Sequence, residues 1–222
     1  MKKIKDSKQS RKKLKRPKVM PAWQECSWRR RACGKMSCPI CGRIARDRQK
    51  HILAGEDPDN LHAVFADVGA SLSEALMAIK QDALAHGIEI SNIDDIKEPP
   101  PPETFPLHEK VREWWEGVME IVERAHDEGE PWLLSEAGQD FSWYASTLLA
   151  KTARQLDNRW HISEQDSYGE FDYNYTRYVL SEVIAILKKS LPILISLDTS
   201  QKKQFQLALI CLSGLGEEII KI

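Results

Sequence analysis

Four of the five cysteines in this chain of 222 residues lie within sixteen consecutive positions, and they constrain the fold more than any other feature. They are Cys26, Cys33, Cys38 and Cys41. The second pair has the C-x2-C spacing of a zinc knuckle, in which two thiolates bind one tetrahedral ion from a tight turn. We expect Gly42 to take a strained backbone conformation just after that turn. The sequence therefore predicts a small module, residues 21–55, in which the four cysteines bind one Zn²⁺.

Other interpretations of the cysteines stay open at this point. A disulfide is disfavoured because nothing in the sequence indicates secretion. A redox C-x-x-C usually lies at a helix start within a βαβ unit, and no such pattern is visible. An iron–sulfur cluster also takes four cysteines. The gap between Cys26 and Cys33 is wide for a knuckle, and His51 could replace Cys26 as the fourth ligand.

Charge is distributed unevenly along the chain, although the formal net charge is only −1. Residues 1–50 contain 18 Lys and Arg against 3 acidic residues, a balance of +15. Residues 51–140 contain 21 acidic and 5 basic residues, a balance of −16, and residues 141–222 contain 9 of each. This asymmetry predicts a basic part that binds nucleic acid or another polyanion, beside a separate acidic body.

The first twenty residues should form a disordered basic arm, because ten bases and one acid cannot bury a core. The arm either contacts phosphates or only aids solubility, and its place directly before the cysteine module favours phosphate contact. Trp23 and Trp28 flank Cys26, where each ring either packs over the metal loops or stacks on a base. The candidate nucleic-acid-binding residues are Lys12, Lys13, Lys15, Arg16, Trp28, Arg29, Arg30, Arg31, Lys35, Arg43, Arg46 and Lys50.

Apolar residues recur every three or four positions in the rest of the chain, which predicts an all-helical body over residues 56–222. The expected helices cover residues 60–86, 107–129, 139–157, 170–191 and a last segment from about residue 200, after a short basic helix at 43–54. The apolar stripe of the helix at 60–86 should face a core. Pro192 should kink or end its helix, and Cys211 should be a small core residue. A proline-rich linker is expected at 88–106.

The predicted architecture is therefore all-α: a disordered basic N-terminal arm, a small four-cysteine zinc-finger module and a multi-helix, bundle-like body. We expect no membrane-spanning segment, because the most apolar stretch, residues 183–197, is interrupted by Lys188, Lys189 and Pro192. No secretory signal is visible at the N-terminus, so a reduced, cytoplasmic setting is expected.

The sequence predicts a protein without enzymatic activity. Common phosphate-loop, dinucleotide-binding, metalloprotease and hydrolase motifs are absent. Glu123-x2-His126 matches half of a carboxylate di-iron site, but a complete ligand set is missing. The acidic row that precedes it on the same predicted helix is more typical of a solvated face or of a site for a basic partner.

The first functional hypothesis is a zinc-containing nucleic-acid-binding protein that uses residues 1–50 to contact DNA or RNA. It would be an accessory subunit of a larger nucleoprotein or nucleic-acid-processing complex, and its helical body would bind a protein partner. A prokaryotic defence or mobile-element complex is one such setting. The alternative hypothesis is a protein-interaction adaptor with a structural zinc and no nucleic-acid binding.

Overall fold

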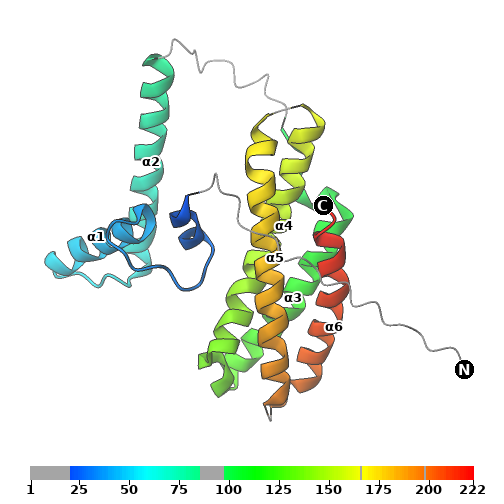
Figure 1. The fold of residues 1–222 in the computed structure, drawn as a ribbon. Helices are drawn as coiled ribbons and strands as arrows, with labels where there is room; N and C mark the ends of the chain where they lie inside the picture. Colours follow the sequence, from blue (N-terminus) through cyan, green and yellow to red (C-terminus); the bar gives the residue numbers. More distant parts are fainter. Residues whose placement is uncertain (1–20, 86–97, 166, 198) are drawn as a thin grey trace, which may run out of the picture. The chain divides into compact units, whose positions relative to one another are not determined.

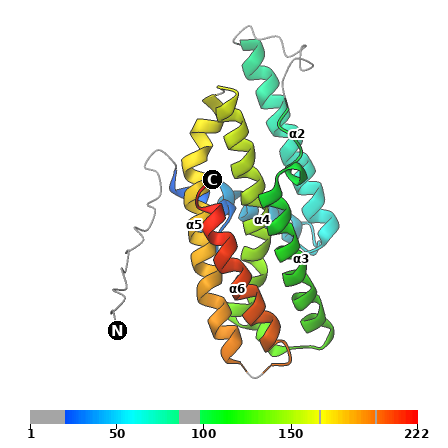
Figure 2. The same ribbon diagram turned by 90° about the vertical axis from the view of Figure 1, so that its right-hand side faces the viewer.

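The computed structural model describes residues 21–85, 98–165, 167–197 and 199–222 (Figures 1 and 2). The predicted basic arm, residues 1–20, and most of the expected linker lie outside the described residues. Within the described ranges every regular element is helical, which confirms the all-α prediction. Contacts divide this part of the chain into two compact units, Pro21–Glu98 and Pro99–Ile222.

The second unit is a four-helix bundle of α3 (Pro106–Asp127), α4 (Glu136–Ser163), α5 (Ser167–Ser196) and α6 (Lys202–Ile219). Helix α3 packs against α4 and α6, and α5 packs against the same two helices, so the four close into a ring (Figure 2). Only short connections join successive helices, which makes sequence neighbours antiparallel. Two short 3-10 helices, η3 (Pro102–Thr104) and η4 (Pro131–Leu134), precede α3 and α4.

The core of the bundle repeats every seven residues on each of its four helices. The fully buried positions in this repeat are Val111, Val118 and Ala125 on α3, Phe141 and Leu148 on α4, Leu180, Leu187 and Leu194 on α5, and Phe205, Leu212 and Ile219 on α6. A seven-residue repeat keeps one seam of a helix facing its neighbours when the helices cross at a small angle. In the bundle, the apolar residues that recur at the predicted three- and four-residue steps therefore form the buried seams along which the helices pack.

Local signals explain several helix ends. Gly55 and Gly129 adopt positive φ angles of +73° and +67° just after α1 (Pro39–Leu53) and α3, as expected of glycines that stop helices. Ser135 caps α4, because its hydroxyl accepts a hydrogen bond from the backbone N–H of Gly138 at 3.0 Å.

Three features of the bundle differ from what we expected. The segment between the expected helices at 139–157 and 170–191 is mostly helical, because α4 continues to Ser163 and α5 begins at Ser167. Of the two effects expected of Pro192, a kink or an end of the helix, the end is wrong: α5 continues to Ser196, and Leu191 and Leu194 on either side of the proline are fully buried. Cys211 is exposed rather than buried, because the buried seam of α6 runs through residues 208 and 212.

The first unit contains η1 (Ala22–Ser27), α1 and the 25-residue α2 (Leu61–Ala85). We expected the first module to end at residue 55 and the helix now labelled α2 to belong to the helical body. The contacts instead place α2 in the first unit. The apolar stripe of α2 does not face a core, since no residue of α2 is buried. By length and composition α2 is also the one helix in the described ranges that is apolar enough to cross a membrane, so residues 183–197 are not the most membrane-like stretch.

The prolines of the expected linker belong to the bundle where the structure describes them. Residues Pro99–Pro102 line a shallow pocket of about 360 Å³ together with Ala150, Ala153 and Arg154 of α4. Helix α3 begins at Pro106, where the missing N–H of proline costs nothing because the first turn leaves its N–H groups unpaired. The end of the proline-rich segment is therefore the start of the bundle.

Candidate metal centre

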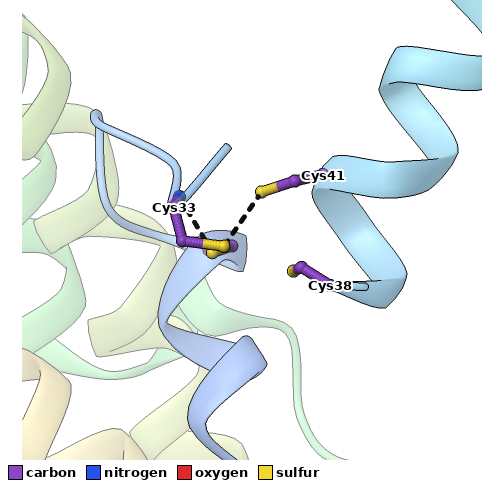
Figure 3. Close-up of side chains that lie close together, drawn as sticks. Cys33, Cys38 and Cys41 are labelled. Atoms are coloured by element: carbon purple, nitrogen blue, oxygen red, sulfur yellow. Dashed lines mark hydrogen bonds between the residues drawn. The ribbon is translucent and has the colours of Figure 1, made fainter. Parts of the chain in front are cut away.

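The four clustered cysteines bring their sulfur atoms together at one point of the first unit. All four Sγ atoms, those of Cys26, Cys33, Cys38 and Cys41, lie within 4.8 Å of one another. The Sγ atoms of Cys33 and Cys41 are 3.6 Å apart (Figure 3). Sulfur atoms bound to one tetrahedral ion at about 2.3 Å are about 3.8 Å apart, whereas a disulfide bond is about 2.05 Å long. The arrangement fits four free thiols around a single metal ion.

Two different elements supply the ligands. Cys26 lies in η1, and the following loop returns Cys33 to it, so that the backbone N–H of Cys33 lies 3.4 Å from the Cys26 sulfur. Cys38 is the N-cap of α1, and Cys41 lies in its first turn. A helix N-terminus carries partial positive charge and favours thiolates. The knuckle is therefore the start of a helix rather than part of a hairpin.

Gly42 is required by space and not by a strained conformation. It lies inside α1 and is not among the glycines with positive φ, so the expected strained conformation was wrong. A Cβ atom at this position would stand 2.2 Å from the backbone oxygen of Met36. Because the loop before Cys38 crosses directly over Gly42, only a glycine allows the knuckle to close against the helix.

The thiols influence one another's acidity. Hydrogen bonds from the backbone N–H of Lys35 and from Cys26 lower the pKa of Cys33 to about 7. The backbone N–H of Cys33 favours the thiolate of Cys26, but burial and hydrogen bonds with Cys33, Cys41 and Cys38 outweigh it and raise the pKa of Cys26 to about 12. Cys26 and Cys33 therefore do not ionise together unless a cation balances their charge, which is what a bound divalent ion does.

His51 lies outside the cysteine cluster, so it does not replace Cys26 in this arrangement. Its Nδ1 lies 2.6 Å from a carboxylate oxygen of Glu56, and its Nε2 lies 3.1 Å from one of Asp67. Both contacts favour the charged imidazolium and raise the pKa of His51. His51 joins the end of α1 to the first half of α2.

The predicted nucleic-acid-binding residues fall into three groups. Lys12, Lys13, Lys15 and Arg16 lie outside the described residues. Arg31, Lys35, Arg46 and Lys50 are exposed, and Arg30 is half-buried. Trp28 is only 2% exposed, and the Arg29 guanidinium lies 4.4 Å from the centre of its ring. Burial of this ring favours packing over base stacking for Trp28, whereas Trp23 is 39% exposed.

Several basic side chains of the module already face acidic partners. Arg29 pairs with Glu25 at 2.5 Å. Arg43 reaches Glu74 of α2 at 2.9 Å, and Lys50 reaches Asp47 at 3.1 Å. Each of these pairs keeps at least one side chain open to solvent, and such pairs are worth little free energy individually.

The half di-iron motif carries no site in the structure. Glu123 and His126 are both exposed on α3, and the remaining acidic residues of the row, Glu113, Glu116 and Glu120, are exposed as well. The row is exposed on the surface of the bundle, which agrees with either a solvated face or a site for a basic partner. Beyond the four cysteines, the described part of the chain contains no other group of His, Cys, Asp and Glu side chains that could hold a metal ion.

Sequence reasoning did not find a groove of about 320 Å³ between α3 and α6. Trp114, Ile121 and Leu207 contribute to its apolar lining, and Glu113 and Glu120 flank it. Leu207 and its neighbour Ile210 are both exposed on α6, so apolar side chains of this helix reach the surface beside the groove. The nearly all-apolar segment at residues 205–212 was the available signal, because a helix that is apolar all round exceeds what one core seam can cover.

None of the protein families, curated proteins or solved structures with which we compared the chain matches it. Its function is therefore argued from its own residues.

Proposed function

We propose that the chain is a nucleic-acid-binding protein without enzymatic activity, whose basic N-terminal part is ordered by a zinc ion. The observation that carries the proposal is the coincidence of the +15 charge balance in residues 1–50 with a four-cysteine cluster in the same segment. A metal-supported loop presents cations to phosphates at a lower entropic cost than a free tail does. The reduced, cytoplasmic setting that keeps four thiols available belongs to the same proposal.

Zinc is the metal that suits the ligands best. Four thiolates around one tetrahedral ion are typical of structural zinc sites. The four thiolates of a four-iron cluster bind four different iron atoms, which spreads their sulfur atoms further apart than the 4.8 Å found here. Zinc would hold η1 and the start of α1 together and supply folding free energy to a unit whose described residues bury few side chains.

The metal is tested by elemental analysis of the purified full chain. We expect one zinc per chain in the wild type and in Cys211→Ser, since Cys211 lies far along the sequence on an exposed face of α6. The Cys38→Ser, Cys41→Ser double variant should lose the ion. Full zinc occupancy in the double variant, or iron in place of zinc in the wild type, would refute this part of the proposal.

Nucleic-acid binding is tested by titrating the full chain against labelled single- and double-stranded DNA and RNA at several salt concentrations. If about five to eight phosphates are neutralised, log K should fall with log salt at a slope of roughly −4 to −7. Removal of residues 1–18 should lower both the affinity and the slope. Absence of binding at low salt would end the proposal.

A matched pair of variants locates the contact on the ordered module. Arg31, Lys35 and Arg46 are exposed in the first unit, and their replacement by Ala should weaken binding. Lys202, Lys203 and Lys221 are exposed on or next to α6, and replacement of these three cations should leave binding unchanged. Equal effects from both sets would mean that only the net charge matters and that the module is not the binding surface.

The groove between α3 and α6 favours the adaptor as a second candidate function. It combines an apolar floor with glutamates at its edge, which suits an amphipathic helix with basic residues. In the first candidate this groove serves the protein partner of an accessory subunit; in the adaptor it is the main function. Affinity purification with Leu207→Glu against wild-type protein tests the groove, because both candidates lose their protein partner in this variant. The two candidates are distinguished by nucleic-acid binding, which only the first expects and which Leu207→Glu should leave unchanged.

A further inference from the structure

Helix α2 exposes a continuous apolar stripe that no described residue of its own unit covers. The stripe consists of Leu61, Phe65, Val68, Leu72, Leu76 and Ile79, whose side chains are between 49% and 70% exposed. No residue of the helix is buried. An isolated helix in water is only marginally stable and gains most of its stability by packing an apolar face. The stripe therefore requires a partner.

The stripe lies on a different side of α2 from the contacts with α1. Those contacts are polar: Glu74 meets Arg43 at 2.9 Å, and Asp67 meets His51 at 3.1 Å. At 3.6 residues per turn, residues 67 and 74 share one side of the helix, while residues 65, 72 and 76 lie on the opposite side. The contacts that anchor α2 in its unit thus leave the apolar stripe available.

The spacing of the stripe is that of a two-helix seam. Five members of the stripe, residues 61, 65, 68, 72 and 79, together with Ala75 follow one another at steps of four, three, four, three and four, and each of them is apolar. Leu76 extends the stripe beside Ala75. Such a repeat places its members along one line that faces a neighbouring helix. A bilayer would place the ionisable side chains of Asp67 and Glu74, in the middle of α2, in hydrocarbon at a cost in free energy, whereas a two-helix seam leaves both in water.

We propose that α2 pairs antiparallel with α2 of a second copy of this chain, around a two-fold axis at Leu72. In this register Phe65 faces Ile79 and Val68 faces Leu76, so larger side chains meet smaller ones. A parallel pair would place Asp82, which continues the seven-residue repeat, against Asp82 of the other copy, and like charges in a seam repel.

The size of the stripe agrees with a dimer of modest affinity. Six large side chains that each cover roughly 100 Å² remove roughly 1,200 Å² in total from water when two helices pair, which is the lower limit for a specific interface. Two-fold symmetry lets the same stripe serve both copies without leaving an open end. We expect a dimer that forms at high protein concentration and dissociates on dilution.

The first test compares the oligomeric state of the full chain over a range of concentrations, by sedimentation equilibrium and light scattering. Wild-type protein should show a monomer–dimer equilibrium. Leu72→Glu places two carboxylates at the two-fold axis and should raise the dissociation constant about 100-fold or more. The matched control is Met77→Glu on another side of the same helix, where Met77 is 57% exposed and Leu72 is 61% exposed. This control should dimerise like the wild type.

The second test addresses the orientation. Phe65→Glu and Ile79→Lys should each weaken the dimer about tenfold or more, because each places a charge in the apolar seam. In the antiparallel register the double variant brings the new carboxylate at residue 65 opposite the new ammonium at residue 79 of the other copy, so it should dimerise more tightly than either single variant. A parallel pair brings like charges together at both positions, so a double variant weaker than both single variants would overturn the antiparallel register.

Each remaining outcome of the first test also decides the proposal. A chain that stays monomeric at every concentration overturns it, whether or not the chain then binds phospholipid vesicles through α2. A dimer that Leu72→Glu leaves intact, or that Met77→Glu weakens equally, is held by another surface and overturns it as well. Circular dichroism of both variants should match the wild type, since both side chains are exposed in the single chain.

Discussion

At the scale of single residues, the metal centre depends on a position that carries no ligand. Gly42 has no side chain to offer, yet the Met36 carbonyl oxygen occupies the place where a Cβ atom would stand. This contact sets the distance between the loop before Cys38 and the first turn of α1. The two ligands of the knuckle therefore keep their separation only if residue 42 is a glycine.

We predict that Gly42→Ala weakens zinc binding about 10-fold or more, an effect comparable to that of losing a supporting group around a metal. The added methyl group must displace the loop, and the loop carries Cys38. Gly69→Ala on α2 is the matched control, because a methyl group at that position would meet no neighbouring segment within 4 Å. It should leave zinc binding unchanged and stabilise α2 by up to about 1 kcal/mol. Competition with a zinc chelator measures both affinities, and equal affinities would contradict the prediction.

At the scale of elements, α1 and α2 are joined by charged side chains rather than by a core. His51 near the end of α1 lies between Glu56 in the connecting loop and Asp67 of α2. The hydrogen bond with Glu56 and then that with Asp67 raise the pKa of His51 above its value in the unfolded chain. A group with a raised pKa stabilises the fold fully below its unfolded pKa, about 6.5, and loses that effect as pH rises through the folded pKa.

We therefore predict that His51→Gln destabilises the first unit near pH 6 and that the difference from the wild type shrinks toward pH 8.5. The measurement is chemical unfolding of the zinc-loaded chain, followed by helix content, at several pH values. His126→Gln on α3 is the control, since this side chain is 84% exposed and lies in the second unit, and it should leave the unfolding of the first unit unchanged. A difference for His51→Gln that grows with pH would contradict the sign of the pKa shift.

Within the bundle, a buried polar pair joins the start of α4 to the start of α6. The indole N–H of Trp132 donates to the side-chain oxygen of Gln201 at 2.8 Å, and both residues are buried. The ring of Trp132 also packs edge-on against Phe141 and Phe205. The pair lies at the end of the seven-residue seam, where the helices would otherwise splay.

We predict that Trp132→Phe lowers the free energy of unfolding by about 1–3 kcal/mol or more, because it leaves the buried oxygen of Gln201 without its donor. Adding Gln201→Leu should recover part of the loss, since it removes the orphaned polar group. Trp143→Phe should have little effect, as Trp143 is 47% exposed. Denaturant titration of the three variants is the measurement. A double variant no more stable than Trp132→Phe would contradict the polar origin of the effect.

At the scale of the whole molecule, the two compact units have different sources of stability. The bundle has a fully buried apolar seam on each helix, whereas α1 buries only Cys41 and Gly42 and α2 buries nothing. Because the described residues of the first unit bury so little, a metal ion bound by the four cysteines would supply most of its folding free energy. The second unit has enough buried apolar surface to fold by itself.

We predict that removal of the metal unfolds the first unit and leaves the bundle intact. After treatment with a chelator, hydrogen exchange should lose protection throughout α1 and α2 while α3, α4, α5 and α6 keep theirs. Loss of α2 follows because its partners on α1, Arg43 and His51, lose their positions. The thermal transition of the bundle should stay unchanged. A shift of that transition on chelation would mean that the units are coupled.

The sequence was sufficient for those properties that depend on neighbours along the chain. A C-x2-C pair places two thiols at one turn, and the other two cysteines lie close to it in the sequence, so the four candidate ligands could be named before any tertiary contact was known. Helical periodicity is likewise a local property, and the stops at Gly55 and Gly129 follow from the freedom of glycine to adopt positive φ. The class of fold and the candidate ligands were therefore predictable.

Only the tertiary structure decided what covers each apolar face. The stripes of α2 and α3 have the same period, yet Val118 is buried and Leu72 is 61% exposed. Periodicity states which side of a helix is apolar, but the partner comes from elsewhere in the chain or from another molecule. Helix α5 passes Pro192 for the same reason, since burial of its neighbours outweighs one missing backbone hydrogen bond. The sequence singled out Gly42, but only the structure gave the reason for a glycine there, which is its contact with the Met36 backbone. A contact between two backbone segments leaves no pattern in the sequence.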